Sequence, residues 1–272
     1  MKERLNNHLD FIEEITDKAL KHFTDKELSE VQKFCFGLIE RLNLSCKSIS
    51  LLLDKFFEET KYEYSLGVIM RASLLDSLIA MNVYRIILES KNKEEKKEVL
   101  DVQVSNFCKN ILSDGLDNAF NHFENLKQNN FINEAQLSSI FNDIAIKAGM
   151  LIESHNGDGS KPVPKFAKKY TPKYLFNELN NTVELKKTGA SIYDSYNYFS
   201  KYDHFGFFYF QLRDEDINKK LIIYKNSIEN LVASMTLLVS LLDHYSQNDN
   251  LLKKLVEKTD KYLNDEIVAT WV

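Results

Sequence analysis

The feature that most constrains this chain is its scarcity of helix-breaking residues. Only 3 prolines and 8 glycines occur among 272 residues, and all three prolines lie within residues 154–172. Glycine and proline supply most tight turns, so a chain with so few of them favours long helices over a many-turned β architecture. The sequence therefore predicts an all-α fold, a multi-helix bundle with one long loop rich in Pro, Gly and Lys at about 154–172.

Apolar residues recur at helical spacing along most of the chain, which is the main signal for amphipathic helices. Thr24, with Glu27 three residues later, predicts a capping box at the start of the second helix. The nearly all-apolar segment at 62–90 is typical of a buried central helix. We expect helices over the following segments: 2–22, 25–58, 62–90, from 99 to about 127, 133–153, 174–187, 190–203, 214–247 and 250–263.

We expect the 272 residues to form a single helical domain. Within it, 1–60 forms an N-terminal helical hairpin, 61–248 the core bundle and 249–272 an amphipathic tail. The tail either caps the bundle or dimerises, and the position of Trp271 at its end favours capping.

Composition excludes several classes of function. A net charge of −5 gives no global reason to expect nucleic acid. Three widely spaced cysteines without a CxxC motif indicate reduced, buried thiols and a cytoplasmic protein. The longest apolar runs, 231–242 and 65–81, are too short or carry charges, so no membrane span is expected. The usual metal and nucleotide motifs are missing, so we expect neither metal nor cofactor.

Arg71 lies inside an apolar run and needs a partner, because an unpaired buried charge is costly. At about 100° per residue, Asp76 is about 140° away on the helix and cannot be its main partner. Two interpretations stay open for Arg71, a structural pair with another element and an anion-binding site. Asp76, beside Ser73 and Ser77, equally suits a polar helix–helix contact.

The stretch "YDSYNYFSKYDHFGFFYF", residues 193–210, contains the second candidate site. On a helix, Tyr196, Ser200 and His204 share one face, with groups suited to acid–base work or to binding a polar ligand. A core histidine among aromatic rings is the alternative. The loop before this region is basic and carries four lysines: Lys161, Lys165, Lys168 and Lys169.

These two motifs, "GVIMRASLLDSLIAM" and "YNYFSKYDHFG", resemble a group of uncharacterised bacterial all-helical proteins with an Arg…acid helix and a later Tyr…Ser…His element. The matching segments cover about residues 60–245. The arrangement is also distantly similar to the HEPN superfamily, whose members include dimeric RNases and toxin or phage-defence components, so the resemblance implies a role in stress or phage defence. Their motif is an arginine followed by four to six residues and a histidine. Here Arg4 and His8 are separated by only three residues, and Phe199 stands where His204 would need an arginine.

Two hypotheses follow. In the first, the chain is a non-enzymatic binding or interaction module, for a homodimer or a protein partner, in which a buried polar network contains these residues: Arg71, Asp76, Tyr196, Ser200 and His204. In the second, it is an HEPN-like RNase or nucleotide-acting enzyme with His204 as acid–base, Ser200 beside it and Arg71 on a phosphate. The lysines of the loop then recruit the polyanion. No catalytic motif is intact, which favours the first.

Overall fold

The computed structural model describes residues 1–113, 116–141, 151–152, 163–164, 170–202, 215–246 and 249–267. Helices dominate the described residues, which confirms the predicted all-α fold. The contacts separate the chain into two compact units, one made of Met1–Glu95 with Pro172–Val272 and the other of Lys96–Thr171. The expectation of a single domain stays a prediction, and each of the two units is described by itself.

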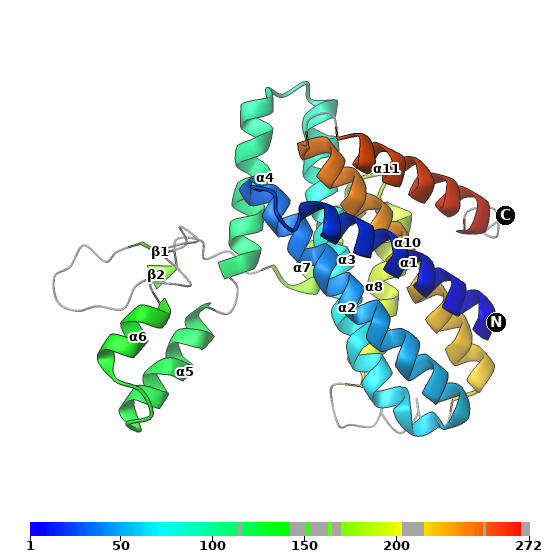
Figure 1. Cartoon of the computed structure of the whole chain (residues 1–272), viewed down its shortest axis with the longest axis horizontal. Helices are drawn as coiled ribbons and strands as arrows, with labels where there is room; N and C mark the ends of the chain where they lie inside the picture. Colours follow the sequence, from blue (N-terminus) through cyan, green and yellow to red (C-terminus); the bar gives the residue numbers. More distant parts are fainter. Residues whose placement is uncertain are drawn as a thin grey trace. The chain divides into compact units, whose positions relative to one another are not determined.

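The first unit contains both chain ends and the longest helices (Figure 1). Three of these helices, α2, α3 and α10, are 29, 30 and 29 residues long. The elements of this unit are α1 (Lys2–Phe23), α2 (Glu30–Glu58), η1 (Thr60–Tyr62), α3 (Glu63–Asn92), α7 (Pro172–Asn180), α8 (Lys186–Ser200), α10 (Ile217–Tyr245), α11 (Asn250–Tyr262) and η3 (Leu263–Ile267).

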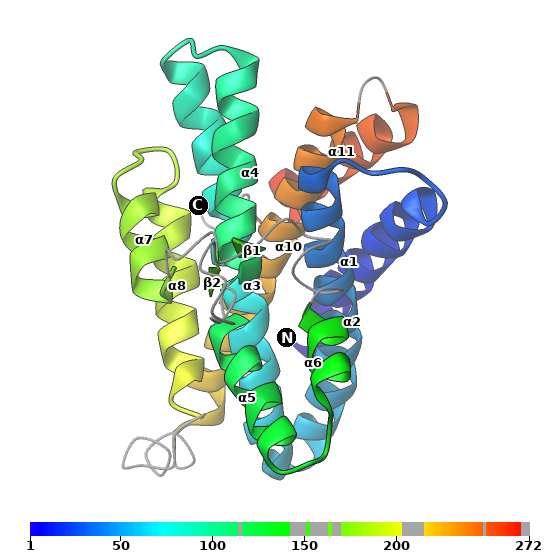
Figure 2. The ribbon, with the colours of Figure 1, turned by 90° about the vertical axis from the view of Figure 1, so that its left-hand side faces the viewer.

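Helices α3 and α10 form the centre of the first unit. Helix α3 packs against α2, α8, α10 and α7, while α10 also packs against α1 and α11. Figure 2 shows α7 and α8 side by side next to α3. Leu66, Leu74, Ile228 and Leu231 are fully buried along these central helices. Burial on several sides explains why the two sequences are apolar nearly all round.

One helical segment among the described residues, Thr60–Asn92, is long and apolar enough to cross a membrane. In this structure 67% of its most apolar window is buried inside the protein. The buried central helix of a helical bundle meets the same two criteria, so the segment is accounted for by its packing.

The second unit contains shorter elements: α4 (Lys97–Ser113), α5 (Leu116–Gln128), α6 (Glu134–Phe141), β1 (Leu151–Ile152) and β2 (Val163–Pro164). Helices α5 and α6 pack against each other, and β1 pairs antiparallel with β2 so that Leu151 lies opposite Pro164. The helix predicted over 133–153 therefore does not reach its expected end, because 151–152 pair with a strand from the loop region.

The predicted capping box at Thr24 is wrong. Thr24 ends α1, and its hydroxyl donates a hydrogen bond to the carbonyl of Leu20 over 3.0 Å. Ser29 starts α2 instead, where its hydroxyl accepts from the Gln32 amide and the Gln32 side chain accepts from the Ser29 amide. The break predicted near 188–189 is also displaced, since α7 ends at Asn180 and α8 begins at Lys186.

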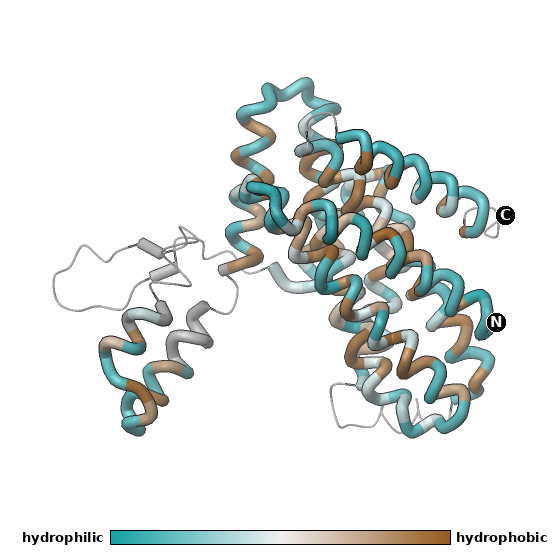
Figure 3. The backbone as a smooth tube through the Cα atoms, in the orientation of Figure 1, coloured by the Kyte–Doolittle hydropathy of each residue, from teal (hydrophilic) through white to brown (hydrophobic). Residues whose placement is uncertain are grey.

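The tail helix α11 packs on α10 and more lightly on α1. Figure 3 shows it as a mainly hydrophilic helix with hydrophobic positions at intervals. Leu252, Leu255 and Thr259 are its buried residues, spaced three and four apart as expected for an amphipathic helix.

Candidate functional site

Arg71 on α3 and Tyr196 on α8, two residues that the sequence singled out, are in contact. Arg71 Nη2 donates a hydrogen bond to the Tyr196 hydroxyl over 3.1 Å, and the guanidinium carbon lies 5.3 Å from the centre of the Tyr196 ring. A guanidinium near an aromatic ring is stabilised by about 0.5–2 kcal/mol. The contact gives Arg71 a partner within the protein and helps to join α3 to α8.

Asp76 does not belong to this contact. Its Oδ2 accepts a hydrogen bond from Arg41 Nε of α2 over 2.8 Å. Burial raises the pKa of Asp76, and the hydrogen bond and charge of Arg41 act in the opposite direction. Asp76 therefore links α2 to α3, in agreement with the polar helix–helix contact that the sequence suggested. The other prediction, which placed Asp76 in one network with Arg71 and Tyr196, needs correction. The opposite helix faces of Arg71 and Asp76 explain the separation.

Of the remaining predicted site residues, the structure describes only Ser200. The Ser200 hydroxyl donates a hydrogen bond to the Asn197 carbonyl over 2.8 Å at the end of α8. His204 lies outside the described residues, as do the four lysines of the basic loop: Lys161, Lys165, Lys168 and Lys169. A shared face of Ser200 and His204, and any role of the loop, stay predictions.

The aromatic stretch instead contributes Tyr202 to a buried polar group that sequence reasoning missed. Glu63, at the start of α3, accepts a hydrogen bond from the Tyr202 hydroxyl at 2.6 Å and one from Lys220 Nζ of α10 at 2.8 Å. The side chains of Lys220 and Glu63 are only 2% and 7% exposed. We call Glu63, Tyr202 and Lys220 the buried cluster.

The buried cluster is enclosed by aromatic rings. Tyr224 is fully buried, and its ring centre lies 5.3 Å from that of Phe199. A Cβ atom added to Gly67 would lie 2.7 Å from the ring of Tyr202, so this position accepts only glycine without movement. Burial raises the pKa of Tyr202 far above its usual range, and the neighbouring Tyr224 and the hydrogen bond to Glu63 act in the same direction, so its hydroxyl stays protonated and donates.

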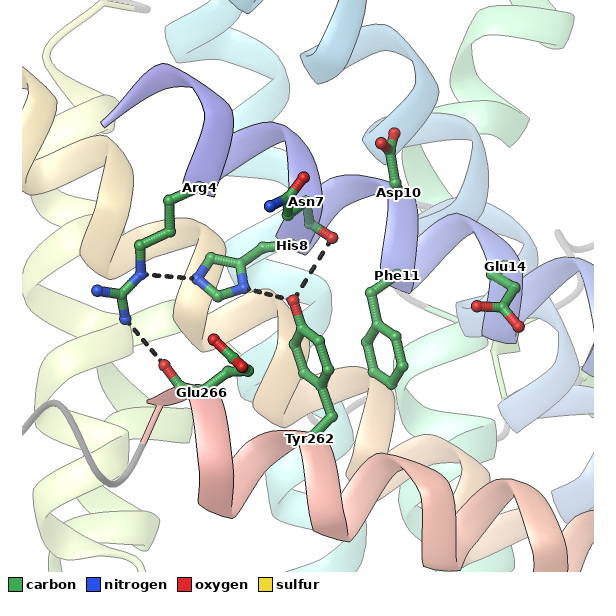
Figure 4. A pocket seen from close by; sticks show the side chains of 8 residues that line it. All are labelled: Arg4, Asn7, His8, Asp10, Phe11, Glu14, Tyr262 and Glu266. Carbon is green, nitrogen blue, oxygen red and sulfur yellow. Dashed lines mark hydrogen bonds between the residues drawn. The ribbon is translucent and has the colours of Figure 1, made fainter.

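A second polar group lines a pocket of about 390 Å³ between α1 and the C-terminal segment (Figure 4). We call it the α1–α11 pocket. Its lining residues come from α1, α11 and η3: Arg4, Asn7, His8, Asp10, Phe11, Glu14, Tyr262 and Glu266. In Figure 4 the α1 residues lie on one side and Tyr262 and Glu266 on the other.

His8 connects the two sides of this pocket. Arg4 Nε lies 3.4 Å from His8 Nε2, His8 Nδ1 lies 2.9 Å from the Tyr262 hydroxyl, and that hydroxyl lies 3.5 Å from the Asn7 carbonyl. A guanidinium N–H can only donate, so His8 Nε2 accepts and the ring proton is on Nδ1. Nδ1–H then donates to Tyr262, whose own hydrogen is directed to Asn7. The hydrogen bonds thus specify one neutral tautomer of His8.

The surroundings of His8 also favour its neutral form. The residue is 1% exposed, and burial lowers its pKa below 6.5; Glu229 opposes this shift and Arg4 reinforces it. Glu229 of α10 is fully buried, with Oε1 at 4.0 Å from His8 Nε2, 3.3 Å from Arg4 Nη2 and 3.5 Å from Lys225 Nζ. Arg4 Nη2 also donates to the Glu266 carbonyl over 2.8 Å.

Two aromatic rings form part of the lining. The rings of Phe11 and Tyr262 stack with centres 3.7 Å apart and planes at 9°. Lys258 Nζ lies 5.5 Å from the Phe11 ring centre and 2.6 Å from Glu14 Oε1. Burial and the charge of Glu266 raise the pKa of Tyr262 to about 12, so the hydroxyl is neutral at physiological pH.

The other end of α11 is fixed by Asp249. Its Oδ1 accepts hydrogen bonds from the amides of Leu251 and Leu252, and its Oδ2 lies 2.5 Å from His22 Nε2 and 3.1 Å from Lys26 Nζ. Burial raises the pKa of Asp249, but the hydrogen bonds from His22 and Lys26 outweigh it and hold the pKa well below its usual range.

Metal and thiol chemistry can be assessed only for the described residues. No group of His, Cys, Asp and Glu suited to a metal ion occurs among the residues that the structure describes. Cys35, Cys46 and Cys108 are buried and in no disulfide, and burial raises the pKa of Cys35 to about 12. These thiols are small buried hydrophobic groups, as the sequence predicted.

The α1–α11 pocket was only partly visible in the sequence. Arg4 and His8 are four residues apart and so share one helix face, which the sequence shows. Their partners Glu229 and Tyr262 are more than 200 residues away, and no local pattern indicates those contacts.

In comparisons with known proteins, no family model, curated protein or solved structure matches the chain.

Proposed function

We propose that the chain is a non-enzymatic binding module whose α1–α11 pocket takes an alkylammonium group, from a small diamine or from a lysine side chain of a protein partner. The observation that carries this proposal is a solvent-open pocket whose uncommitted charged groups are acidic. The diamine and the lysine side chain both carry a primary ammonium group on an alkyl chain.

The electrostatics of the lining favour a cation. Arg4, the one fixed cation in the lining, already contacts Glu229 and the Glu266 carbonyl. Within the described part of the chain, the carboxylates of Asp10 and Glu266 are left exposed for a ligand. Both carboxylates raise the pKa of Tyr262 through their negative charge, against the opposing charge of Arg4. A phosphate would meet repulsion there.

The protein itself places one alkylammonium group in these surroundings. Lys258 has its ammonium near the Phe11 ring and against the Glu14 carboxylate. Ammonium groups are attracted both to aromatic faces and to carboxylates. A ligand ammonium near Tyr262 and Glu266 would make the same two kinds of contact at the other end of the pocket.

The geometry of His8 supports binding rather than catalysis. A general base needs a free nitrogen within hydrogen-bond reach of a substrate proton. Both ring nitrogens of His8 are already within hydrogen-bond distance of protein groups. The pocket therefore suits the recognition of a ligand, with His8 as part of its wall.

The test is isothermal titration of the full chain at pH 7.5 with 1,5-diaminopentane and, separately, with the peptide acetyl-Lys-Lys-Lys-amide. We expect saturable binding that weakens about two- to fivefold in Glu266→Gln, the usual contribution of an exposed ion pair. The matched control is Glu257→Gln, which removes the same charge from an exposed site on α11 outside the pocket.

The ligands also separate the two sources and the competing function. Binding of the peptide but not the diamine supports a protein partner, and the reverse supports a small amine. Equal binding of 1,5-pentanediol, or equal loss in both variants, would contradict the ammonium site. Turnover of RNA or a mononucleotide that Arg71→Ala or a His204 variant abolishes would replace the proposal with the enzyme hypothesis.

Kinship with the HEPN superfamily, a bacterial source, a cytoplasmic location and dimerisation stay predictions from the sequence. None of them is needed for the ammonium site, since all of its residues belong to one copy of the first unit.

A further inference from the structure

We infer that the α1–α11 pocket prefers a primary ammonium to a quaternary one, and that Lys258 sets this preference by covering the ring of Phe11. The inference rests on the proposed function, since selectivity has a meaning only if the pocket binds an amine. For a protein partner, it means that the pocket recognises an unmodified lysine and that trimethylation of that lysine weakens binding.

The Phe11 ring of α1 lies between two side chains of α11. Tyr262 stacks on it with ring centres 3.7 Å apart and planes at 9°, and contact at this distance leaves no space for another group on that face. The Lys258 ammonium, 5.5 Å from the Phe11 ring centre, therefore lies at the other face. Figure 4 agrees with this arrangement, since Tyr262 lies on one side of the Phe11 ring and Glu14, which binds Lys258, lies on the other.

Lys258 is held in this position by the carboxylate of Glu14. Its Nζ lies 2.6 Å from Glu14 Oε1, and Lys18 Nζ lies 2.5 Å from the same oxygen. The hydrogen bonds from Lys18 and from Lys258 lower the pKa of Glu14, so the carboxylate is charged at neutral pH. Because Lys258 is tethered to α11, its effective concentration at this carboxylate exceeds that of a free ligand. The Glu14 end of the pocket is thus filled from within the chain.

The other end of the pocket offers carboxylates and at most one aromatic face. Tyr262 has left only the face turned away from Phe11, and the exposed carboxylates in the lining are those of Asp10 and Glu266. A primary ammonium carries three N–H donors, which form charge-assisted hydrogen bonds with carboxylates. A quaternary ammonium has no N–H, and proteins recognise it with a cage of aromatic faces. These surroundings therefore favour the primary ammonium.

Removal of the Lys258 side chain would change this balance. It would uncover the second face of Phe11 beside the Glu14 carboxylate, and an aromatic face attracts a methylated cation as well as an unmethylated one. Lys18 contacts the same carboxylate from α1, but of the two lysines only Lys258 has its ammonium over the Phe11 ring. A comparison of the two lysines thus separates the effect of the ring from the effect of the charge.

The experiment is isothermal titration of the full chain at pH 7.5 with two ligands of equal charge and chain length, n-pentylammonium and pentyltrimethylammonium. In the wild type we expect the primary ammonium to bind about tenfold more tightly, the factor that one charge-assisted hydrogen bond contributes. Equal affinities, or tighter binding of the quaternary ligand, overturn the inference. This comparison needs no variant, so it does not depend on the folding of a mutant.

Lys258→Ala should reduce the ratio of the two affinities about two- to fivefold, the contribution of one exposed cation–π contact. The matched control is Lys18→Ala, which removes the same charge from the same carboxylate; the Lys18 and Lys258 side chains are 50% and 43% exposed. Loss of charge alone raises both affinities together, so the ratio should keep its wild-type value in the control. An unchanged ratio in Lys258→Ala, or an equal change in both variants, contradicts the role of Lys258.

The outcomes also separate this inference from the proposed function. If neither ligand binds to the wild type, the proposed function fails and the selectivity fails with it. If both bind equally, only the selectivity fails and the ammonium site remains. The peptide acetyl-Lys-Lys-Lys-amide should likewise bind more tightly than its trimethylated form, and the reverse order would contradict the inference.

Discussion

The buried cluster and the α1–α11 pocket contain similar groups in different surroundings. The buried cluster combines Glu63, Lys220 and the Tyr202 hydroxyl. The pocket is lined by Arg4 and the Tyr262 hydroxyl, and the buried Glu229 contacts Arg4 from outside the lining. In the first, Lys220 is 2% exposed and every member faces protein. In the second, Arg4 is 36% exposed and the group opens into a pocket.

This difference lies in burial, more than in residue type, and under the proposed function it separates a structural polar group from one that binds a ligand. Two charges removed from water are stable only when their partners are complete, and such a pair leaves no capacity for a ligand. At the edge of the bundle, water screens each charge and a ligand can replace water. The following predictions test that contrast, from the largest expected effect to the smallest.

The largest effect is expected from Glu63→Gln, which removes the carboxylate that pairs with the buried Lys220 ammonium. Loss of one partner of a buried pair reduces the free energy of unfolding by about 3–5 kcal/mol. Urea denaturation measures this value. As a control, Glu58→Gln removes a pair with Lys55 whose side chains are 61% and 46% exposed, and should leave the free energy of unfolding nearly unchanged. Similar effects in both variants would contradict the contrast.

The next effect comes from two glycines with different surroundings. Gly67→Ala places a methyl group against the Tyr202 ring and should reduce the free energy of unfolding by about 1–3 kcal/mol through overpacking. Gly37 on α2 has nothing within 4 Å of the added atom, so Gly37→Ala should stabilise the helix by about 0.5–1 kcal/mol. Thermal denaturation of the two variants shows whether their stability changes have opposite signs.

A matched pair of tyrosine variants compares the two polar groups directly. Tyr202→Phe removes a hydrogen bond to a buried carboxylate and should reduce the free energy of unfolding by about 1.5–3 kcal/mol. Tyr262→Phe keeps the ring stack but removes the hydroxyl that accepts from His8. It should reduce the free energy of unfolding by about 0.5–1.5 kcal/mol. Equal losses in denaturation experiments would show that the pocket is as closed as the buried cluster.

The smallest effect at neutral pH is expected from Asp249→Asn. Asparagine also caps helices, so the main loss is the ion pair with Lys26, about 0.2–1 kcal/mol. In acid the variant should differ more clearly from wild type. Because the pKa of Asp249 is lowered, its contribution is present above about pH 3.8 and lost below it. Stability measured from pH 5 to pH 2 should fall less steeply in the variant, and parallel curves would contradict this assignment.

The sequence predicted the fold class because helix signals are local. Scarce glycine and proline, together with apolar residues every three or four positions, indicate α1, α2, α3 and α10 without knowledge of their packing. The capping box was misplaced because Thr24 and Ser29 both suit a helix start, and only the position of α1 decides between them. The division into two units depends on contacts that periodicity does not contain.

The polar groups were harder to predict than the helices. The helical wheel separated Arg71 from Asp76 correctly, and the structure pairs them with Tyr196 and Arg41. In the sequence, Glu63 is an ordinary acidic residue in the first turn of a helix. Its contact with Lys220 of α10 is visible only in the structure.

The most direct test of the binding site is an NMR titration of the histidine ring signals with 1,5-diaminopentane at pH 7.5 and constant ionic strength. We predict that the His8 signal shifts saturably, while those of His122 and His244 do not, and that the Lys220 and Tyr202 signals of the buried cluster stay unchanged. An unchanged His8 signal, or a shift of similar size at every histidine, would contradict a specific ammonium site at the α1–α11 pocket.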